Sequence, residues 1–344
     1  MSQSICIMRL SAIGDVCHAA AMVTRITQAW PDTKVTWVIG KIEHQLVKGM
    51  LNVEFIVCDK AQPDARAQLK KALGGREFDV LLLMQVALRA NWFASVIKAK
   101  RRIGFDWARS KEGHWLFTNE RIAATKHTHV LDGFMQFADK IGVPAMPLDW
   151  AIPIDAQDRE WAQQQANQFG RFVIIAPAAS KAMRNWTAAG YANIIAQLIE
   201  HNITPVICGG PGPVDADISQ NILALCSQKQ HAKLHNLVGI TSLKQMLALM
   251  ALADCVVAPD TGPAHMATTV RTPVVGLYAH SNPLRTGPYL TINQTVSVYE
   301  EAIQQEFGQS WQQLPWGTRA KGKDWMSHLK SATVWDNIAT LIHI

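Results

Sequence analysis

The chain has 344 residues, of which 49% are hydrophobic and 17% are charged, and its formal net charge is +6. These values are typical of a folded globular protein and exclude a disordered chain, and the length favours two domains over a single core. No apolar run is as long as the roughly 18 to 20 residues of a membrane-spanning helix, and the opening MSQSICIMRL lacks the basic and apolar regions of a secretion signal.

The six cysteines are spread along the chain and form no CxxC pair. Four of them lie in apolar, strand-like runs: Cys6, Cys58, Cys208 and Cys255. Buried, reduced thiols explain this distribution better than a disulfide framework does. We therefore expect a cytoplasmic protein.

The positive charge is confined to the first half of the chain. Residues 1–150 contain 20 Lys and Arg against 14 Asp and Glu, whereas residues 151–344 contain 13 of each kind. Much of the surplus lies in KAKRRIGFDWARSK, residues 98–111, which has six basic residues and one acidic residue. This segment is either a solvated surface turn or a face that meets an anionic partner.

Short apolar runs alternate with amphipathic ones in the first half. Four of the runs predict strands: SICIMRL (4–10), KVTWVIG (34–40), VEFIVCD (53–59) and FDVLLLMQ (78–85). Two segments between them, residues 18–30 and 65–73, have the pattern of helices. The first strand is followed by SAIGD (11–15), which puts Asp15 at the start of the first helix. Such an aspartate is either a helix cap or a reactive group beside an anion site.

The second half repeats the alternation. Five runs predict strands: RFVIIAPAA (171–179), ITPVICGG (203–210), LHNLVG (234–239), DCVVAPD (254–260) and TPVVGLY (272–278). Helices are predicted at 186–200, where apolar residues recur every three or four positions after Thr187 as N-cap, and at 241–253. A last helix is expected near TVWDNIATLI (333–342).

Strands rich in Val, Ile and Leu that alternate with helices imply parallel sheets covered on both faces. Because the pattern occurs twice, the sequence predicts an α/β protein of two Rossmann-like, doubly wound domains that face each other across a cleft. The proline-rich stretch 142–157 separates them. The predicted division is a first domain at 1–145, a linker at 146–157, a second domain at 158–330 and a C-terminal helix at 331–344, which either stays with the second domain or crosses back to the first.

Ligands of such sheets bind in the loops that follow the strands. Besides SAIGD, three of these loops carry reactive or flexible residues: APAASKAMRNW (176–186), CGGPGPVDAD (208–217) and APDTGPAHMATT (258–269). In the last loop, Asp260, Thr261 and Gly262 lead from a strand into a helix that has His265 in its first turn. A helix start of this kind suits a phosphate or diphosphate, although Asp260 and Thr261 equally fit simple capping of the helix.

Metal and cofactor motifs are missing from the sequence. The 12 histidines show neither HExxH nor Cys/His zinc spacing, and there is no Walker A, G-x-S-x-G or G-x-G-x-x-G motif. We expect no bound metal and no cofactor.

Taken together, RLSAIGDVCHAAAMVTRITQAWPDTKVTWVIG (9–40) and ADCVVAPDTGPAHMATTVRTPVVGLYAHSNPLRTGPY (253–289) resemble the family 9 glycosyltransferases, the bacterial heptosyltransferases of lipopolysaccharide core synthesis. The likeness extends over nearly the whole chain. It is greatest to type I enzymes, which add the first heptose to the inner-core sugar Kdo, and the tail WGTRAKGKDWM is similar to a subgroup that acts on a phosphorylated single Kdo. The resemblance implies a GT-B fold and metal-independent transfer with inversion at the anomeric carbon.

The resemblance also implies roles for individual residues. Asp15 matches the proposed general base, and Arg184 falls where relatives usually carry a lysine that acts on the leaving diphosphate, with Lys181 as the alternative. The donor ADP-heptose would be bound by the second domain, through Ser180, Lys181, Asp215, Ile240, Asp260, Thr261, Gly262 and His265. The acceptor, Kdo-lipid A at the inner membrane, would be bound by the first domain, for which the basic residues Lys98, Lys100, Arg101 and Arg102 are candidates.

The implied location is the cytoplasmic face of the inner membrane, with the protein bound peripherally. Two other functions remain open at this point: a nucleotide-sugar epimerase on a similar scaffold, which needs no acceptor, and a non-catalytic two-domain protein that binds a sugar or nucleotide. Nucleic-acid binding ranks last, because the basic half contains no recognition module.

Overall fold

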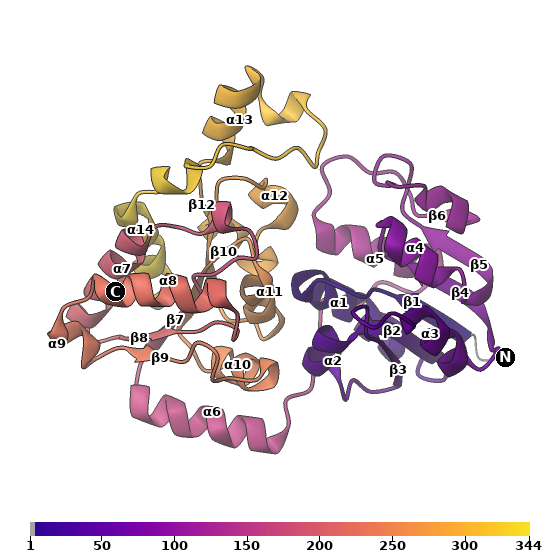
Figure 1. Ribbon diagram of the computed structural model, residues 1–344, viewed down its shortest axis with the longest axis horizontal. Coiled ribbons are helices and arrows are strands. Elements are labelled where there is room, and N and C mark those ends of the chain that lie inside the picture. The colour runs from indigo at the N-terminus through magenta and orange to yellow at the C-terminus, as the bar shows by residue number, and fades with distance from the viewer. Residues whose placement is uncertain (1–3) are drawn as a thin grey trace. The chain divides into compact units, whose positions relative to one another are not determined.

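The computed structural model describes residues 4–344, which divide into two compact units, one up to Pro153 and one from Ile154 to Ile344 (Figure 1). The division falls inside the predicted linker 146–157. Every predicted strand and helix is present, and each unit contains one parallel sheet, as the alternating pattern indicated. Each sheet has six strands, of which β5, β6 and β12 were not predicted.

The first unit has the strand order β3-β2-β1-β4-β5-β6. Its strands are β1 (Ser4–Met8), β2 (Lys34–Gly40), β3 (Val53–Cys58), β4 (Glu77–Leu83), β5 (Lys98–Gly104) and β6 (Glu120–Arg121). Its helices are α1 (Ile13–Ala29), α2 (Lys41–Val47), α3 (Ala65–Leu73), α4 (Leu88–Ala94), the 3-10 turn η1 (His114–Phe117) and α5 (Val130–Lys140).

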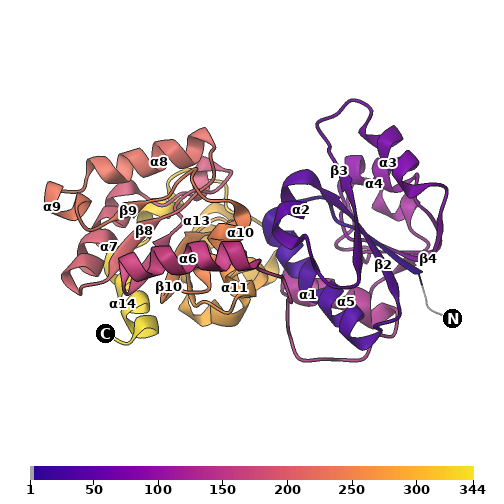
Figure 2. The same cartoon turned by 90° about the horizontal axis from the view of Figure 1, so that it is seen from below.

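Both faces of this sheet are covered. Helices α1 and α5 pack against each other (Figure 2), whereas α3 and α4 join the core cluster that contains Cys6 and Met8. Successive residues of a strand point to opposite faces, and Ile5, Cys6, Ile7 and Met8 are all fully buried. A strand buried on both sides has no polar alternation, which explains its continuous apolar sequence.

The second unit has the order β12-β11-β10-β7-β8-β9. Its strands are β7 (Phe172–Ile175), β8 (Thr204–Ile207), β9 (His235–Asn236), β10 (Cys255–Pro259), β11 (Val274–Tyr278) and β12 (Val296–Ser297). Its α-helices are α6 (Ala156–Phe169), α7 (Ala188–Glu200), α8 (Pro213–Ala224), α9 (Gln228–His231), α10 (Leu243–Met250), α11 (Gly262–Thr269), α12 (Pro283–Thr286), α13 (Tyr299–Phe307) and α14 (Ser331–Ile342). Four 3-10 turns complete it: η2 (Ala182–Arg184), η3 (Tyr289–Gln294), η4 (Trp311–Gln313) and η5 (Trp325–His328).

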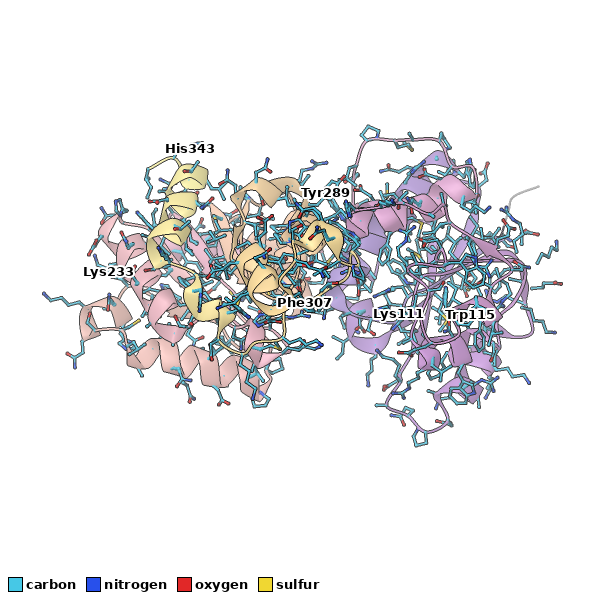
Figure 3. All side chains as sticks on the ribbon, turned by 90° about the horizontal axis from the view of Figure 1, so that it is seen from above. Lys111, Trp115, Lys233, Tyr289, Phe307 and His343 are labelled. Atoms are coloured by element: carbon cyan, nitrogen blue, oxygen red, sulfur yellow. The ribbon has the colours of Figure 1, made fainter. Side chains whose placement is uncertain are left out.

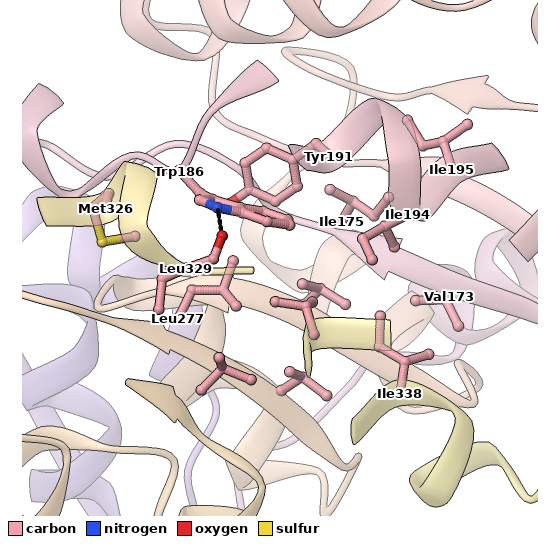
Figure 4. Packing of buried hydrophobic residues seen from close by; sticks show 14 of the residues in the cluster. Val173, Ile175, Trp186, Tyr191, Ile194, Ile195, Leu277, Met326, Leu329 and Ile338 are labelled. Carbon is pink, nitrogen blue, oxygen red and sulfur yellow. Dashed lines mark hydrogen bonds between the residues drawn. The ribbon is translucent and has the colours of Figure 1, made fainter. Parts of the chain in front are cut away.

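Helix α7 and the C-terminal segment share one core (Figure 4). Thr187 caps α7 as predicted, its hydroxyl accepting a hydrogen bond from the Gly190 N–H. The Trp186 indole N–H donates to the Leu329 carbonyl oxygen at 3.2 Å. Helix α14 packs against α7, and the C-terminal helix is part of the second compact unit.

The buried His114 links η1 to α4 in the first unit by hydrogen bonds. The His114 Nε2 accepts a hydrogen bond from the Phe105 N–H, so its Nδ1 carries the proton and donates to the Asn91 Oδ1 at 2.9 Å. Both His114 and Asn91 are fully buried. Burial, assisted by the nearby charge of Arg121, lowers the pKa of His114 to about 4, so the ring is neutral near pH 7.

We expect this histidine to make the fold acid-sensitive. The pKa of His114 in the folded chain lies below the ordinary histidine value of 6.5. The contribution of this residue to the free energy of unfolding is therefore complete above about pH 6.5. The contribution is lost as the pH falls toward about 4, by up to roughly 3 kcal/mol. Urea unfolding at about pH 7.5 and about pH 5 should show a larger decrease for the wild type than for His114→Gln. Equal decreases would contradict this assignment.

Candidate active site

Each sheet has one position where the strand order reverses. In the first unit it lies between β1 and β4, and in the second unit between β10 and β7. The loops after two such strands run in opposite directions, which leaves a crevice at the carboxyl ends where open α/β sheets bind ligands. The predicted Asp15 follows β1, and the predicted Arg184 and Asp260 follow β7 and β10.

In the first unit, Arg9 joins the two loops at the reversal point. Its guanidinium donates one hydrogen bond to the Met84 carbonyl oxygen beyond β4 and another to the Asp15 Oδ2. The guanidinium also lies 5.3 Å from the centre of the Phe134 ring on α5. Arg9 is therefore held on three sides, and its position determines where the Asp15 carboxylate lies.

Asp15 is not the N-cap of α1. That position belongs to Ala12, and Asp15 is the third residue of the helix, with its Oδ2 3.5 Å from the Ala12 N–H, at the outer limit of a hydrogen bond. Both contacts fall on Oδ2, so Oδ1 accepts no hydrogen bond from the described part of the chain. The side chain is 36% exposed. The carboxylate is thus fixed through one oxygen and open through the other.

Arg9 and Gln85 were not predicted as site residues from the sequence. The Gln85 Oε1 accepts from the Leu10 N–H at 2.9 Å, and its Nε2 approaches the Ser11 Oγ at 3.4 Å, which ties the loop after β4 to the loop after β1. The available signal was position, because Arg9 and Gln85 each directly follow the last apolar residues of the two strands that flank the reversal point.

In the second unit, Arg184 and Asp260 form an ion pair across the reversal point. The Arg184 Nη1 lies 3.2 Å from the Asp260 Oδ2 and 3.3 Å from the Asp260 carbonyl oxygen. The side chains are only 15% and 13% exposed. The Ser281 hydroxyl, from the loop after β11, donates to the same Oδ2 at 2.6 Å. Three post-strand loops therefore meet at one carboxylate.

Simple capping does not explain Asp260 and Thr261. Thr261 is the N-cap residue of α11, but its side chain makes no capping hydrogen bond, and Asp260 is engaged by Arg184 and Ser281 instead. Gly262 begins the helix and Pro263 follows in its first turn. The first N–H groups of α11 thus receive no side-chain cap from Thr261, which is the arrangement an anion can use.

The other donor-binding candidates of this edge differ in exposure. Ser180 and Lys181 are exposed on the loop before η2, and Lys181 forms no ion pair with any residue in 4–344. His265 is buried in α11, with 6% of its surface exposed. Of the two candidate cations, Lys181 is therefore the exposed one, while Arg184 is held by Asp260.

Asp215 and Ile240 lie on two loops that touch. The Asp215 Oδ1 accepts from the Gly210 N–H at 2.8 Å, which shapes the glycine-rich loop after β8. The Gly239 N–H donates to the Gly209 carbonyl oxygen at 3.0 Å, and Gly239 has a φ of +74° that favours glycine. Ile240, 65% exposed, follows directly. An apolar side chain and a carboxylate are thus presented at the same edge of the sheet.

The four basic residues predicted to bind the acceptor are part of β5 rather than of a surface turn. Lys100 pairs with Asp79 at 2.8 Å, and Arg101 pairs with Glu120 at 2.6 Å. Arg102 donates to the carbonyl oxygens of Phe117, Ile97 and Ala94.

Their position also separates them from Asp15. Lys98 pairs in register with Glu77 at the amino end of β4, whereas Asp15 follows the carboxyl end of β1. In a parallel sheet these are opposite edges. Lys98 and Asp15 therefore lie at opposite edges of the sheet, and acceptor binding by Lys98, Lys100, Arg101 and Arg102 stays a prediction.

Residues 4–344 contain neither a cluster of metal-ligating side chains nor a membrane-spanning helix. No group of three or more His, Cys, Asp or Glu side chains is arranged to hold a metal ion. Among the same residues, no helix has the length and apolarity needed to cross a membrane.

The two Rossmann-like units have the architecture of the GT-B fold, and solved structures agree with it. The glycosyltransferase family 9 protein of Veillonella parvula DSM 2008 superposes with a TM-score of 0.81 at 19% identity, over 100% of this chain and 98% of that one. Heptosyltransferase WaaC of E. coli with ADP superposes with a TM-score of 0.74 at 19% identity, over 98% and 99% of the chains. At these identities the likeness shows the fold alone.

The sequence comparisons are more specific. A family model described as Glycosyltransferase family 9 (heptosyltransferase) matches residues 66–316. Lipopolysaccharide core heptosyltransferase OpsX of Haemophilus influenzae is 44% identical over 95% of this chain and 94% of its own length. Lipopolysaccharide heptosyltransferase 1 of Escherichia coli K12 is 21% identical over 83% of this chain and 90% of its own. The chain belongs to glycosyltransferase family 9, the heptosyltransferases, and is an enzyme of that class.

Proposed function

We propose that this enzyme transfers L-glycero-D-manno-heptose from ADP-heptose to the Kdo sugar of lipid A during synthesis of the lipopolysaccharide core. Family membership supports heptosyl transfer over the epimerase and over a non-catalytic binding protein. Identity is higher with the OpsX protein than with heptosyltransferase 1, so the subgroup we infer is that of OpsX. The acceptor is then Kdo in either its free or its phosphorylated form.

The observation that carries the donor assignment is the Asp260 carboxylate held by Arg184 and Ser281 beside the start of α11. Glycosyl transfer leaves a nucleoside diphosphate whose negative charge grows as the bond to the sugar breaks, and fixed donors and cations lower the barrier most. The N–H groups of α11 and the Arg184 guanidinium supply them at one place. No step of this scheme needs a metal.

The neighbouring loops support a nucleoside subsite. Ile240 offers an apolar surface for a base, and the Asp215 carboxylate has its Oδ2 available for ribose hydroxyls while its Oδ1 accepts from Gly210. We assign Ser180 and Lys181, on the loop before η2, to the phosphate end of the donor. We also assign to the donor His265 and Gly262, in the first turn of α11. We assign donor binding to the second unit on this basis.

Asp15 is the proposed general base. The acceptor hydroxyl must lose its proton as its oxygen attacks the anomeric carbon, and a carboxylate open through one oxygen can take that proton. Since Oδ2 is held by Arg9, Oδ1 is the atom that we assign to proton transfer. Arg9 acts as a positioning residue, because its contact with Asp15 orients the carboxylate. We assign acceptor binding to the first unit, at the cytoplasmic face of the inner membrane.

A panel of nucleoside diphosphates tests the donor assignment. ADP should raise the melting temperature of the purified chain more than GDP or UDP at equal concentration. A ligand present at about 100 times its Kd adds about 2.7 kcal/mol to the free energy of unfolding. The stabilisation should be weaker in Lys181→Ala. Equal shifts for the three nucleotides, or no shift for any of them, would remove the proposed donor.

The role of Arg9 is tested by a double-mutant cycle. Arg9→Met should lower kcat by about tenfold to a hundredfold with little change in the donor KM, because Asp15 loses its orientation. In an Asp15→Asn background, the same substitution should have almost no further effect. Arg9→Lys keeps one charged donor and should recover part of the activity. Additive losses in the cycle would show that Arg9 acts independently of Asp15.

A further inference from the structure

Four large apolar side chains are exposed together in the first unit, and we call them the tryptophan patch. Their exposed fractions are 56% for Leu88, 63% for Trp107, 41% for Trp115 and 76% for Leu116. The rings of Trp107 and Trp115 lie 5.8 Å apart. The Leu88 N–H donates to the Glu112 Oε2 at 2.6 Å, which holds the start of α4 against the loop that precedes η1.

The patch is built on a rigid support. The buried His114, described above, binds α4 through Asn91 and the end of β5 through Phe105, while the next two residues, Trp115 and Leu116, are exposed. Trp115 and the nearby Lys111 are labelled in Figure 3. The hydrogen bonds of His114 fix this helical turn, although burial of the ring costs desolvation. Trp115 and Leu116 extend from the fixed turn and are therefore exposed in a defined direction.

Cations surround the patch. The Arg121 guanidinium lies 4.0 Å from the centre of the Trp107 ring. Lys111 is exposed and forms no ion pair with any residue between 4 and 344, and Arg89 is exposed on the first turn of α4 beside Leu88. The surroundings of the patch therefore complement a negatively charged surface.

We propose that the tryptophan patch and its cations dock the enzyme on an anionic lipid bilayer. Tryptophan rings settle at the boundary between headgroups and acyl chains, leucine enters the apolar layer, and lysine and arginine bind lipid phosphates. A surface that binds a protein partner would have apolar residues and few cations, whereas this patch has apolar residues surrounded by cations. The proposal rests on the proposed function, because it names the surface by which a lipid-borne acceptor is approached.

The location of the patch agrees with that role. Leu88 follows β4, and Trp107 and η1 follow β5, so the patch lies at the carboxyl edge of the sheet. Asp15 follows β1 at the same edge of the same sheet. Docking by this edge brings lipid headgroups to the side of the first unit on which the proposed base lies.

Co-sedimentation with vesicles tests the proposal on the full chain. Wild-type protein should bind vesicles of phosphatidylcholine mixed with phosphatidylglycerol, and bind vesicles of phosphatidylcholine alone much less. The double variant Trp115→Ser/Leu116→Ser should bind the mixed vesicles at least about tenfold more weakly, because two side chains lose their burial in lipid. Leu51→Ser is the matched control, since Leu51 is 83% exposed just before β3 at the amino edge, and it should bind as the wild type does.

A charge reversal separates the electrostatic part. Lys111→Glu should lower binding to the mixed vesicles by roughly tenfold and leave binding to phosphatidylcholine unchanged. Lys70→Glu, on α3 and outside the patch, should change neither. Equal binding of wild type and Trp115→Ser/Leu116→Ser would overturn the proposal. A wild type that ignores vesicles but forms dimers that this double variant dissociates would overturn it in favour of a second copy of the chain.

An acceptor without a lipid chain distinguishes this proposal from the function on which it rests. With a soluble Kdo acceptor, Trp115→Ser/Leu116→Ser and Lys111→Glu should transfer heptose at the wild-type rate. Loss of vesicle binding with normal transfer to the soluble acceptor supports docking by the patch. Vesicle binding without any heptosyl transfer would refute the enzymatic function and leave the docking surface in place.

Discussion

Asp15→Asn should abolish most turnover while leaving donor binding intact. The amide has the shape of the carboxylate but cannot accept the proton of the acceptor hydroxyl, so kcat should fall by about two orders of magnitude or more. The fold should be unaffected, because Asp15 is 36% exposed and its Oδ2 contacts are available to an amide oxygen. The measurement is steady-state kinetics with both substrates, together with the thermal shift that ADP produces.

The matched control for Asp15→Asn is Asp59→Asn. Asp59 also follows a strand of the first unit and pairs with Lys41 at 3.4 Å, but it follows β3, away from the reversal point. It should retain near-normal turnover. An Asp15→Asn enzyme that keeps more than about a tenth of the wild-type kcat would exclude Asp15 as the base.

Arg184→Ala should have the second largest effect, a loss in kcat/KM of about a hundredfold to a thousandfold. The substitution removes a cation from the departing diphosphate. It also leaves the Asp260 carboxylate, only 13% exposed, without its ion-pair partner and with its charge directed at the donor phosphates. Both consequences disfavour the transition state more than the bound donor, so kcat should fall more than KM rises.

Two variants give this result its meaning. Arg184→Lys preserves the charge but not the planar fork, and should lie between the wild type and Arg184→Ala. Lys181→Ala should weaken donor binding while leaving kcat within a few-fold of the wild type, since Lys181 is exposed and unfixed. If Lys181→Ala instead lost more kcat than Arg184→Ala, the cation at the diphosphate would be Lys181.

The sheets could be predicted from the sequence because their inner strands are buried on both faces. Runs such as ICIM and FVII have no polar residue to interrupt them, and each is followed by a loop with Gly, Pro or Asp. Post-strand loops of a parallel sheet share one edge, so Asp15, Arg184 and Asp260 could be named as candidate site residues without coordinates.

Strand β5 could not be predicted in the same way. Its sequence KAKRRIG has charged residues at most positions, which is unlike a buried strand. The strand tolerates these charges because Lys100 pairs with β4, Arg101 pairs with β6 and Arg102 binds backbone carbonyl oxygens. Such pairs join residues distant in the sequence, and no local sequence pattern predicts them. Arg9 could not be predicted for the same reason, because its position depends on contacts with Met84 and Phe134 rather than on its sequence neighbours.

The sequence also could not decide whether Asp260 caps the helix or has other partners. Asp and Thr before a helix are frequent caps, and only the positions of Arg184 and Ser281 show that this carboxylate has other partners. The packing partner of the C-terminal helix could not be predicted either. Its apolar face at Val334, Ile338 and Ile342 could pack against any apolar surface, and only the fold shows that the partner is α7.

Acceptor-dependent release of ADP tests the central claim most directly. The purified enzyme is incubated with ADP-heptose, with and without Kdo-lipid A, and ADP and the lipid product are measured together. We predict that ADP forms only when the acceptor is present, in equal amount to the heptose gained by the lipid, and that Asp15→Asn forms neither. Consumption of ADP-heptose without acceptor, or unchanged product formation by Asp15→Asn, would contradict the account.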